Sequence, residues 1–144
     1  MTKSFHQLPA PGDIVWCRFP EDLGAPGSKP RPALVLGVGF SDSEKDTVRV
    51  AYGTTKRVRE KFSGEFEITP NDGVAFTLSG LSYPTKFDLK KTQVLPYTEE
   101  WFAVPPNPRH GANPKLGTLH PSLMKRAEAT SKRRPTGSII GFPG

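Results

Sequence analysis

The sequence predicts a mainly β protein, a small barrel or highly curved sheet of about six short strands with one helix near the C-terminus. Short apolar or alternating segments recur along the chain, with turn residues about every 8–12 positions. The apolar content is only 35%, and 14 glycines and 16 prolines punctuate the 144 residues. Both facts fit one domain with a small core and many turns.

The first predicted strand covers residues 12–20. Its wholly apolar face is expected to meet the core and consists of Val15, Cys17 and Phe19. Trp16 shares the other face with Ile14 and Arg18. We therefore expect Trp16 on the more exposed face of the strand, near a groove or an interface.

The second predicted strand covers residues 33–38 and follows an arginine held between two prolines, Pro30 and Pro32. Pro32 cannot donate a ladder hydrogen bond, so it suits the first position of a strand. The two prolines stiffen the backbone around Arg31, whose guanidinium fork suits a phosphate. The alternative is an ordinary arginine at a loop–strand junction, paired with a carboxylate.

Further short segments alternate or are rich in β-branched and aromatic residues, and are predicted as strands: 47–52, 65–68, 85–89 and 92–97. Residues 74–78 fit an edge strand or an extended connector, and residues 105–111 an irregular linker. One more short strand is possible at 116–119.

Residues 121–130 are predicted as the single helix. Pro121 suits its first turn, and an apolar stripe follows helical spacing: Leu119, Leu123, Met124 and Ala127. The domain organisation is then an N-terminal extension (1–11), a folded domain (12–130) and a basic, Gly/Pro-rich tail (131–144). We expect Ser138 to Phe142 of this tail to dock on its own barrel or on a partner subunit, because Ile139, Ile140 and Phe142 are large and apolar.

The net charge of +6 is concentrated in the last third of the chain. Residues 1–102 carry 13 basic and 13 acidic side chains. Residues 103–144 carry seven basic side chains against Glu128 alone. This asymmetry favours contact with a polyanion, most simply a nucleic acid. The alternative is a solvated basic helix and tail.

Several classes of protein are disfavoured by the sequence. The single cysteine, Cys17, rules out an intramolecular disulfide framework, and no Cys/His cluster has zinc spacing. We expect no metal or other cofactor. The chain has no run of 18 apolar residues and no signal-peptide core, so the cytosol is the expected compartment and no membrane partner is expected.

Six segments form a recognisable order along the chain: Gly12-Asp13-Ile14-Val15-Trp16, Arg31-Pro32-Ala33-Leu34-Val35-Leu36, Val50-Ala51-Tyr52-Gly53-Thr54-Thr55-Lys56, Glu65-Phe66-Glu67-Ile68, Lys86-Phe87-Asp88, and Leu116-Gly117-Thr118-Leu119 with the helix after it. This order of motifs resembles the PemK/MazF family of toxin endoribonucleases over about residues 12–130. Lys86 stands where some members carry arginine, residues 95–114 are longer than in short members, and the tail has no counterpart.

The resemblance implies an SH3-like or plasmid-maintenance-toxin barrel, a homodimer, a cognate antitoxin partner and metal-independent cleavage of single-stranded RNA. Such cleavage uses the RNA 2′-hydroxyl as nucleophile and leaves a 2′,3′-cyclic phosphate and a 5′-hydroxyl. The protein must accept a proton, stabilise the phosphorane charge and protonate the leaving oxygen.

Four residues are the catalytic candidates. Arg31 would stabilise the phosphorane, with proton donation through a water or from a strongly perturbed site as an additional role, and Thr54 would hydrogen-bond the phosphate or the 2′-hydroxyl. Asp88 would accept the proton or orient Arg31, and Lys86 would add a point charge. The alternatives are a turn role for Thr54 and an exposed ion pair between Lys86 and Asp88, worth about 0–1 kcal/mol.

RNA is expected to be held by a loop with two hydroxyls and several cations, in which the candidates are Thr55, Lys56, Arg57, Arg59 and Lys61. Trp16 or Tyr83 would stack on unpaired bases, with core or dimer packing as the alternative. Because His6, His110 and His120 lie in termini or linkers, a histidine-based mechanism is less expected.

A second hypothesis is a non-catalytic module on the same barrel. One version binds nucleic acid, duplex DNA included, through the basic last third of the chain. Another version targets DNA gyrase, as related folds do. The chain end Gly141-Phe142-Pro143-Gly144 does not resemble the tryptophan-containing end of gyrase-poisoning relatives, which ranks this version low.

Overall fold

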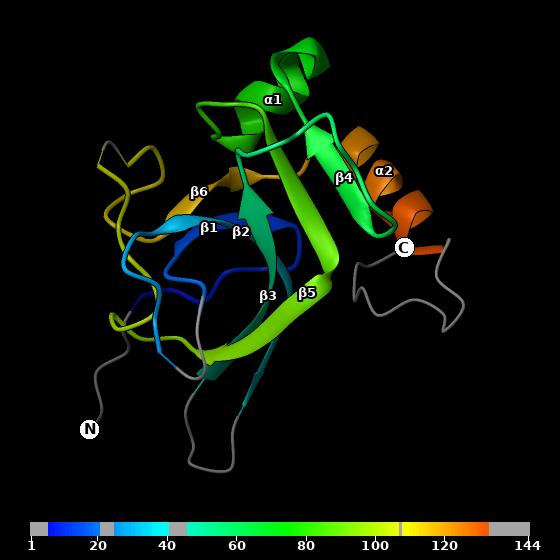
Figure 1. The fold of residues 1–144 in the computed structure, drawn as a ribbon. Helices are drawn as coiled ribbons and strands as arrows, with labels where there is room; N and C mark the ends of the chain where they lie inside the picture. The colour runs from blue at the N-terminus through cyan, green and yellow to red at the C-terminus, as the bar shows by residue number, and fades with distance from the viewer. Residues whose placement is uncertain (1–5, 21–24, 41–45, 107, 133–144) are drawn as a thin grey trace, which may run out of the picture.

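A computed structural model describes residues 6–20, 25–40, 46–106 and 108–132. Within them the chain forms one curved antiparallel sheet in the order β4-β5-β3-β2-β1-β6 (Figure 1). The strands are β1 (Asp13–Cys17), β2 (Arg31–Phe40), β3 (Asp46–Thr54), β4 (Glu65–Ile68), β5 (Thr85–Pro96) and β6 (Lys115–Thr118). The prediction of a mainly β fold of six strands with a C-terminal helix is confirmed, and the curvature is consistent with a small barrel.

One long strand replaces two predicted short ones. Residues 85–89 and 92–97 were expected as separate strands, but β5 runs through both. Its pairing with β3 shifts register, since Tyr52 pairs with Asp88 and Ala51 with Thr92. Residues 89–91 are thus accommodated in a bulge, which lets β5 bend without ending.

Both faces of the central strands are buried. A helix-side core lies on one face and comprises Ile14, Leu34, Leu36, Ala51, Phe66, Ile68, Ala75, Leu81, Phe87, Leu89, Leu119, Leu123 and Ala127. A loop-side core lies on the other and comprises Val15, Cys17, Phe19, Ala33, Val35, Val48, Val50, Leu95, Tyr97, Trp101 and Phe102. The expected core face of β1 is confirmed. The expectation of a more exposed opposite face holds at Trp16 and Arg18, which are half-buried, but not at Ile14, which is fully buried.

Helices cover the helix-side core. The predicted apolar stripe of α2 (Pro121–Lys132) is confirmed, with Leu123 and Ala127 fully buried. The prediction of a single helix is wrong, because α1 (Val74–Ser79) lies where an edge strand or connector was expected at residues 74–78, and a 3-10 turn, η1 (Pro70–Asp72), precedes it.

Local capping explains this difference. The Thr69 hydroxyl accepts a hydrogen bond from Asn71 N at 3.2 Å, and Asp72 Oδ2 accepts one from Thr69 N at 2.8 Å. This reciprocal capping box starts a helical turn. Gly80 then ends α1 with φ of 72°, and a Cβ there would collide with the Leu116 carbonyl of β6. Only glycine fits both conditions.

The chain on either side of the predicted irregular linker, residues 105–111, packs beside β1. Residues 97–103 carry Trp101 and Phe102 into the loop-side core. Arg18 N donates to Trp101 O at 2.7 Å, and Trp16 N donates to Pro114 O at 2.8 Å. The chain on both sides of the predicted linker is therefore hydrogen-bonded to residues 16–18, through Trp101 and Ala103 before it and Pro114 after it.

Burial also determines the protonation state of the single thiol, Cys17. Cys17 is fully buried in the loop-side core, which raises its pKa to about 12. The thiol therefore stays protonated near neutral pH and packs as a small apolar group.

Two further observations bear on the domain limits. None of the helices in the described part of the chain is long and apolar enough to cross a membrane. The helix α2 continues to Lys132, two residues past the expected domain end, and the expected docking of Ser138 to Phe142 lies outside the described residues.

Candidate active site and nucleic-acid interface

The sheet brings Arg31 and Thr54 to the same end of two neighbouring strands. Ala33 pairs with Tyr52, and the same antiparallel register continued by two residues sets Arg31 opposite Thr54. Opposed residues of antiparallel strands point to the same face. Arg31 and Thr54, both half-buried, therefore project from the loop-side face, at the start of β2 and the end of β3.

Asp88 lies on the same face, one step along the strands. It pairs with Tyr52 of β3 on one side and with Glu65 of β4 on the other. Its carboxylate is half-buried, and Oδ1 accepts a hydrogen bond from Lys90 N at 2.9 Å. Three candidate residues predicted from separate motifs thus meet on the adjacent strands β2, β3 and β5.

Gly53 sets the spacing of these strands at the site. A Cβ at this position would lie 2.7 Å from Phe87 Cε1 and still closer to the Pro32 carbonyl. A side chain would push β3 away from β2 and β5. The glycine between Tyr52 and Thr54 therefore holds the Arg31 and Thr54 backbones close together.

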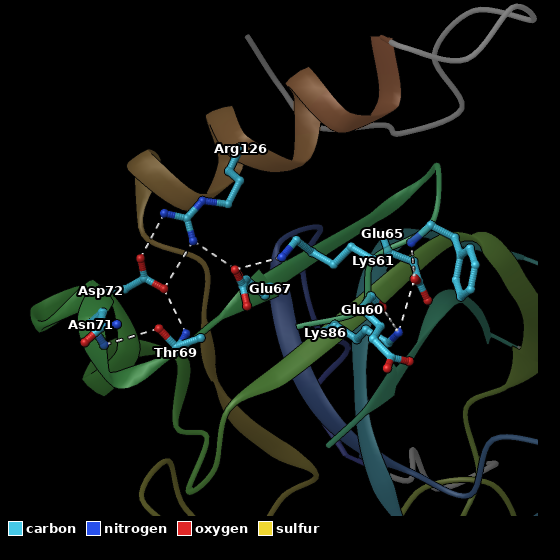
Figure 2. A network of polar contacts seen from close by, with 10 residues as sticks. Glu60, Lys61, Glu65, Glu67, Thr69, Asn71, Asp72, Lys86 and Arg126 are labelled. Carbon is cyan, nitrogen blue, oxygen red and sulfur yellow. Dashed lines mark hydrogen bonds and ion pairs between the residues drawn. The ribbon is translucent and has the colours of Figure 1, made fainter. Parts of the chain in front are cut away.

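Lys86 occupies a different environment from the one expected. It pairs with Thr54 across β3 and β5, but only 6% of its surface is exposed. Its Nζ donates to Glu60 O at 2.6 Å and to Glu65 Oε1 at 3.2 Å (Figure 2). The alternative of an exposed Lys86–Asp88 pair is therefore wrong, because Lys86 is buried and its carboxylate partner is Glu65.

The loop 55–64 lies over this buried pair. Glu65 Oε1 also accepts a hydrogen bond from Phe62 N at 2.7 Å, so one carboxylate oxygen binds both Lys86 and the loop backbone. The Thr54 hydroxyl accepts a hydrogen bond from Lys56 N at 3.1 Å. The expected turn role of Thr54 is thus present, and a hydroxyl that accepts this bond still has its own proton to donate.

The predicted RNA-binding cations of this loop divide into two groups. Lys56, Arg57 and Arg59 are exposed. Lys61 forms an ion pair with Glu67 at 2.9 Å, with about a third of each side chain exposed. Phosphate binding by Lys61 would have to compete with that carboxylate.

Two hollows adjoin the candidate site. The larger, of about 1090 Å³, is lined by Thr55, Arg57, Arg59 and Tyr83 together with β4 and η1 residues. The smaller, of about 340 Å³, is lined by Trp16, Thr55, Tyr83, Arg109 and Lys115 among others. Thr55 and Tyr83 line both, so the two hollows share a wall.

Sequence reasoning missed three cations near the site. Lys91 Nζ lies 4.0 Å from the centre of the Tyr52 ring, which pairs with Asp88 in the ladder. Arg109 and Lys115 line the smaller hollow. The charge asymmetry did indicate the last third of the chain, but it carried no information on where the irregular segment would place these side chains.

Arg126, also counted in that basic third, has a structural role. Its guanidinium donates to Asp72 Oδ1 at 2.9 Å and Oδ2 at 3.1 Å, and to Glu67 O at 2.9 Å (Figure 2). These bonds attach α2 to η1 and to the edge strand β4. The Arg126 hydrogen bond holds the pKa of Asp72 below its ordinary value, and Asp72 raises the pKa of Arg126.

The variant Asp72→Asn is expected to lower the melting temperature at neutral pH by about 3 °C. A carboxylate whose pKa is lower in the folded state stabilises that state above its unfolded pKa of about 3.9. That stability is lost as the pH falls through the folded pKa. Melting curves of wild type and variant from pH 7 to pH 2.5 should therefore converge at the acid end. A constant difference across this range would contradict the assignment.

The remaining candidates are peripheral. His110 lies exposed in the segment 108–114, and His120 Nδ1 accepts a hydrogen bond from Ser122 N at 3.1 Å at the start of α2. Among the described residues, no three His, Cys, Asp or Glu side chains are grouped as metal ligands would be.

Comparison with known proteins gives a family. A family model described as the PemK-like, MazF-like toxin of type II toxin-antitoxin systems matches residues 10–130. This match confirms the resemblance found in the sequence and covers most of the chain. None of the curated proteins compared with the chain matches it.

Proposed function

Because this chain belongs to the PemK-like, MazF-like toxins of type II toxin-antitoxin systems, we propose that it is a metal-independent endoribonuclease that cleaves single-stranded RNA. The observation that carries the proposal is the shared sheet face of Arg31, Thr54 and Asp88, beside a hollow lined by loop cations. Members of this family are toxins that an antitoxin restrains, so an antitoxin is the partner of this chain.

The chemistry we propose is an in-line attack of the RNA 2′-oxygen on the adjacent phosphorus. A P–O2′ bond forms, the P–O5′ bond breaks, and the products are a 2′,3′-cyclic phosphate and a 5′-hydroxyl. The Asp88 carboxylate takes the 2′-hydroxyl proton. A water molecule held by Arg31 protonates the leaving 5′-oxygen, since an arginine itself does not give up its proton. The proton on Asp88 then neutralises the hydroxide that remains, which restores the carboxylate and the water.

Arg31 and Thr54 stabilise the phosphorane in this proposal. The guanidinium fork of Arg31 matches two phosphate oxygens, and it neutralises the charge that develops during attack. The Thr54 hydroxyl donates to the phosphate or the 2′-oxygen. Its acceptor side is already occupied by Lys56 N, which fixes the direction in which it donates.

Lys86 has a positioning role in the proposal, and does not contact the phosphate as a point charge. Its two hydrogen bonds attach β5 to the loop 55–64. That loop presents Thr55, Arg57 and Arg59 to the larger hollow. RNA is then held along this hollow by exposed cations, and the functional unit is a homodimer.

The test is a cleavage assay with purified protein and single-stranded RNA in the presence of EDTA, followed by analysis of the RNA ends. We expect cleavage with 2′,3′-cyclic phosphate and 5′-hydroxyl ends. Cleavage that disappears in EDTA, or products with 5′-phosphate ends, would contradict the mechanism. Tight binding of duplex DNA with no RNA cleavage would contradict the proposed activity and favour a binding module.

A further inference from the structure

The smaller hollow combines features that a nucleobase site needs. Its volume of about 340 Å³ is at the lower end of the roughly 300–1,000 Å³ of small-ligand pockets. Trp16 and Tyr83 supply aromatic surface, and Tyr83 is 68% exposed although it is a large ring. Aromatic side chains exposed in this way are the usual stacking partners of unpaired bases.

The charges at this hollow suit a polyanion that carries bases. Arg109 is exposed at the wall, and Lys115 is half-buried there, with Nζ 3.6 Å from Asp13 Oδ1. The two cations come from the segment that follows Pro106 and from β6. An aromatic surface flanked by cations binds a base together with its phosphate, whereas a purely apolar partner segment would offer no anion to the exposed Arg109.

The position of the hollow relates it to the proposed reaction. Pro32 and Thr55 line it, and each directly follows a proposed active-site residue, Arg31 or Thr54. Neighbouring residues of one strand point to opposite faces, so Pro32 of β2 projects from the face opposite Arg31, while Thr55 lies just past the end of β3. The hollow therefore opens across the end of the sheet, on the face opposite Arg31, so a single strand crossing this end would meet both.

We propose that this hollow binds one nucleobase of the RNA, next to the cleaved phosphate, and thereby selects the sequence that is cut. The inference rests on the proposed ribonuclease function. Pro105, Pro106 and Arg109, from the segment that is longer here than in short family members, complete its wall. The sequence preference of this protein is then determined partly by a segment outside the shared motifs.

The experiment measures binding, so that it does not depend on cleavage. A fluorescent single-stranded RNA is made uncleavable by 2′-O-methyl groups, and an abasic spacer is moved along it one position at a time. Full-length wild type is compared with Tyr83→Ala. At one spacer position, wild-type affinity is expected to fall about tenfold, the order of one base–aromatic stack. Tyr83→Ala should bind the intact RNA about tenfold more weakly and be insensitive to the spacer at that position.

Controls separate stacking from general effects. Tyr83→Phe keeps the ring and should behave as wild type. Phe40→Ala removes an equally exposed ring, 70% accessible, at the far end of β2 and should leave affinity unchanged. Arg109→Ala should weaken binding at every spacer position and reduce the slope of log affinity against log salt by about one phosphate contact.

The outcomes are distinct. If the abasic spacer lowers the affinity of wild type and of Tyr83→Ala by the same factor at every position, the hollow does not hold a base and the inference is overturned. The same result is expected if the hollow instead binds a protein partner. If wild type also cleaves RNA in the assay above, the proposed function survives that result. If wild type neither binds the uncleavable RNA nor cleaves the natural one, both proposals fail.

Discussion

Replacing Arg31 with alanine is expected to reduce the rate of RNA cleavage by about 10²–10³-fold. The proposed role of Arg31 is to bind charge that appears only in the phosphorane, so the loss should fall on the chemical step. Single-turnover cleavage of a labelled single-stranded RNA measures that step. Affinity for the 2′-O-methyl RNA should change much less, because the ground-state phosphate keeps its contacts with the loop cations.

Arg49→Ala is the matched control for this variant. Arg49 is an exposed arginine on the same strand as Thr54, five residues earlier, so the two Cα atoms lie about 17 Å apart. It should cleave RNA at the wild-type rate. Arg31→Lys keeps the charge but not the two-pronged donor and should recover only part of the activity. Wild-type rates for Arg31→Ala would remove this residue from the mechanism.

The positions of most strands along the chain could be predicted because alternation and turn residues are local properties. The apolar face of β1 and the stripe of α2 followed directly from spacing. The helix α1 could not be predicted, because it depends on the capping box of Thr69 and Asp72 and on the close packing of Gly80 against β6. The first depends on side-chain geometry and the second on a neighbour that is distant in sequence.

The site divides in the same way. Arg31, Thr54 and Asp88 could be chosen because they follow the order of motifs in the family that the sequence resembles, and the strand register then places them on one face. The burial of Lys86 could not be foreseen, because the Glu60 carbonyl reaches it only when the loop 55–64 folds back over β5, and the Glu65 carboxylate only when β4 pairs with β5. The sequence likewise did not indicate that Arg109 and Lys115 line the same hollow, because this depends on the path of the irregular segment between them.

Lys86→Met is expected to destabilise the protein by about 3 kcal/mol. Methionine fills much of the space of the lysine stem but leaves Glu65 as a nearly buried carboxylate, 11% exposed, without its cation. The Glu60 carbonyl loses its 2.6 Å donor at the same time. Urea unfolding measures the loss. The double variant Lys86→Met/Glu65→Gln should recover part of it, because the unpaired charge is removed.

Lys61→Met tests whether this effect is specific to the buried pair. Lys61 forms an ion pair with Glu67 of β4, but that pair is about one-third exposed and should contribute less than about 1 kcal/mol. If Lys86 positions the loop, Lys86→Met should also weaken binding of the 2′-O-methyl RNA, and the double variant should recover part of that binding together with stability. Full stability with a lost chemical step would instead mean that Lys86 itself reaches the phosphate, and the positioning role would be wrong.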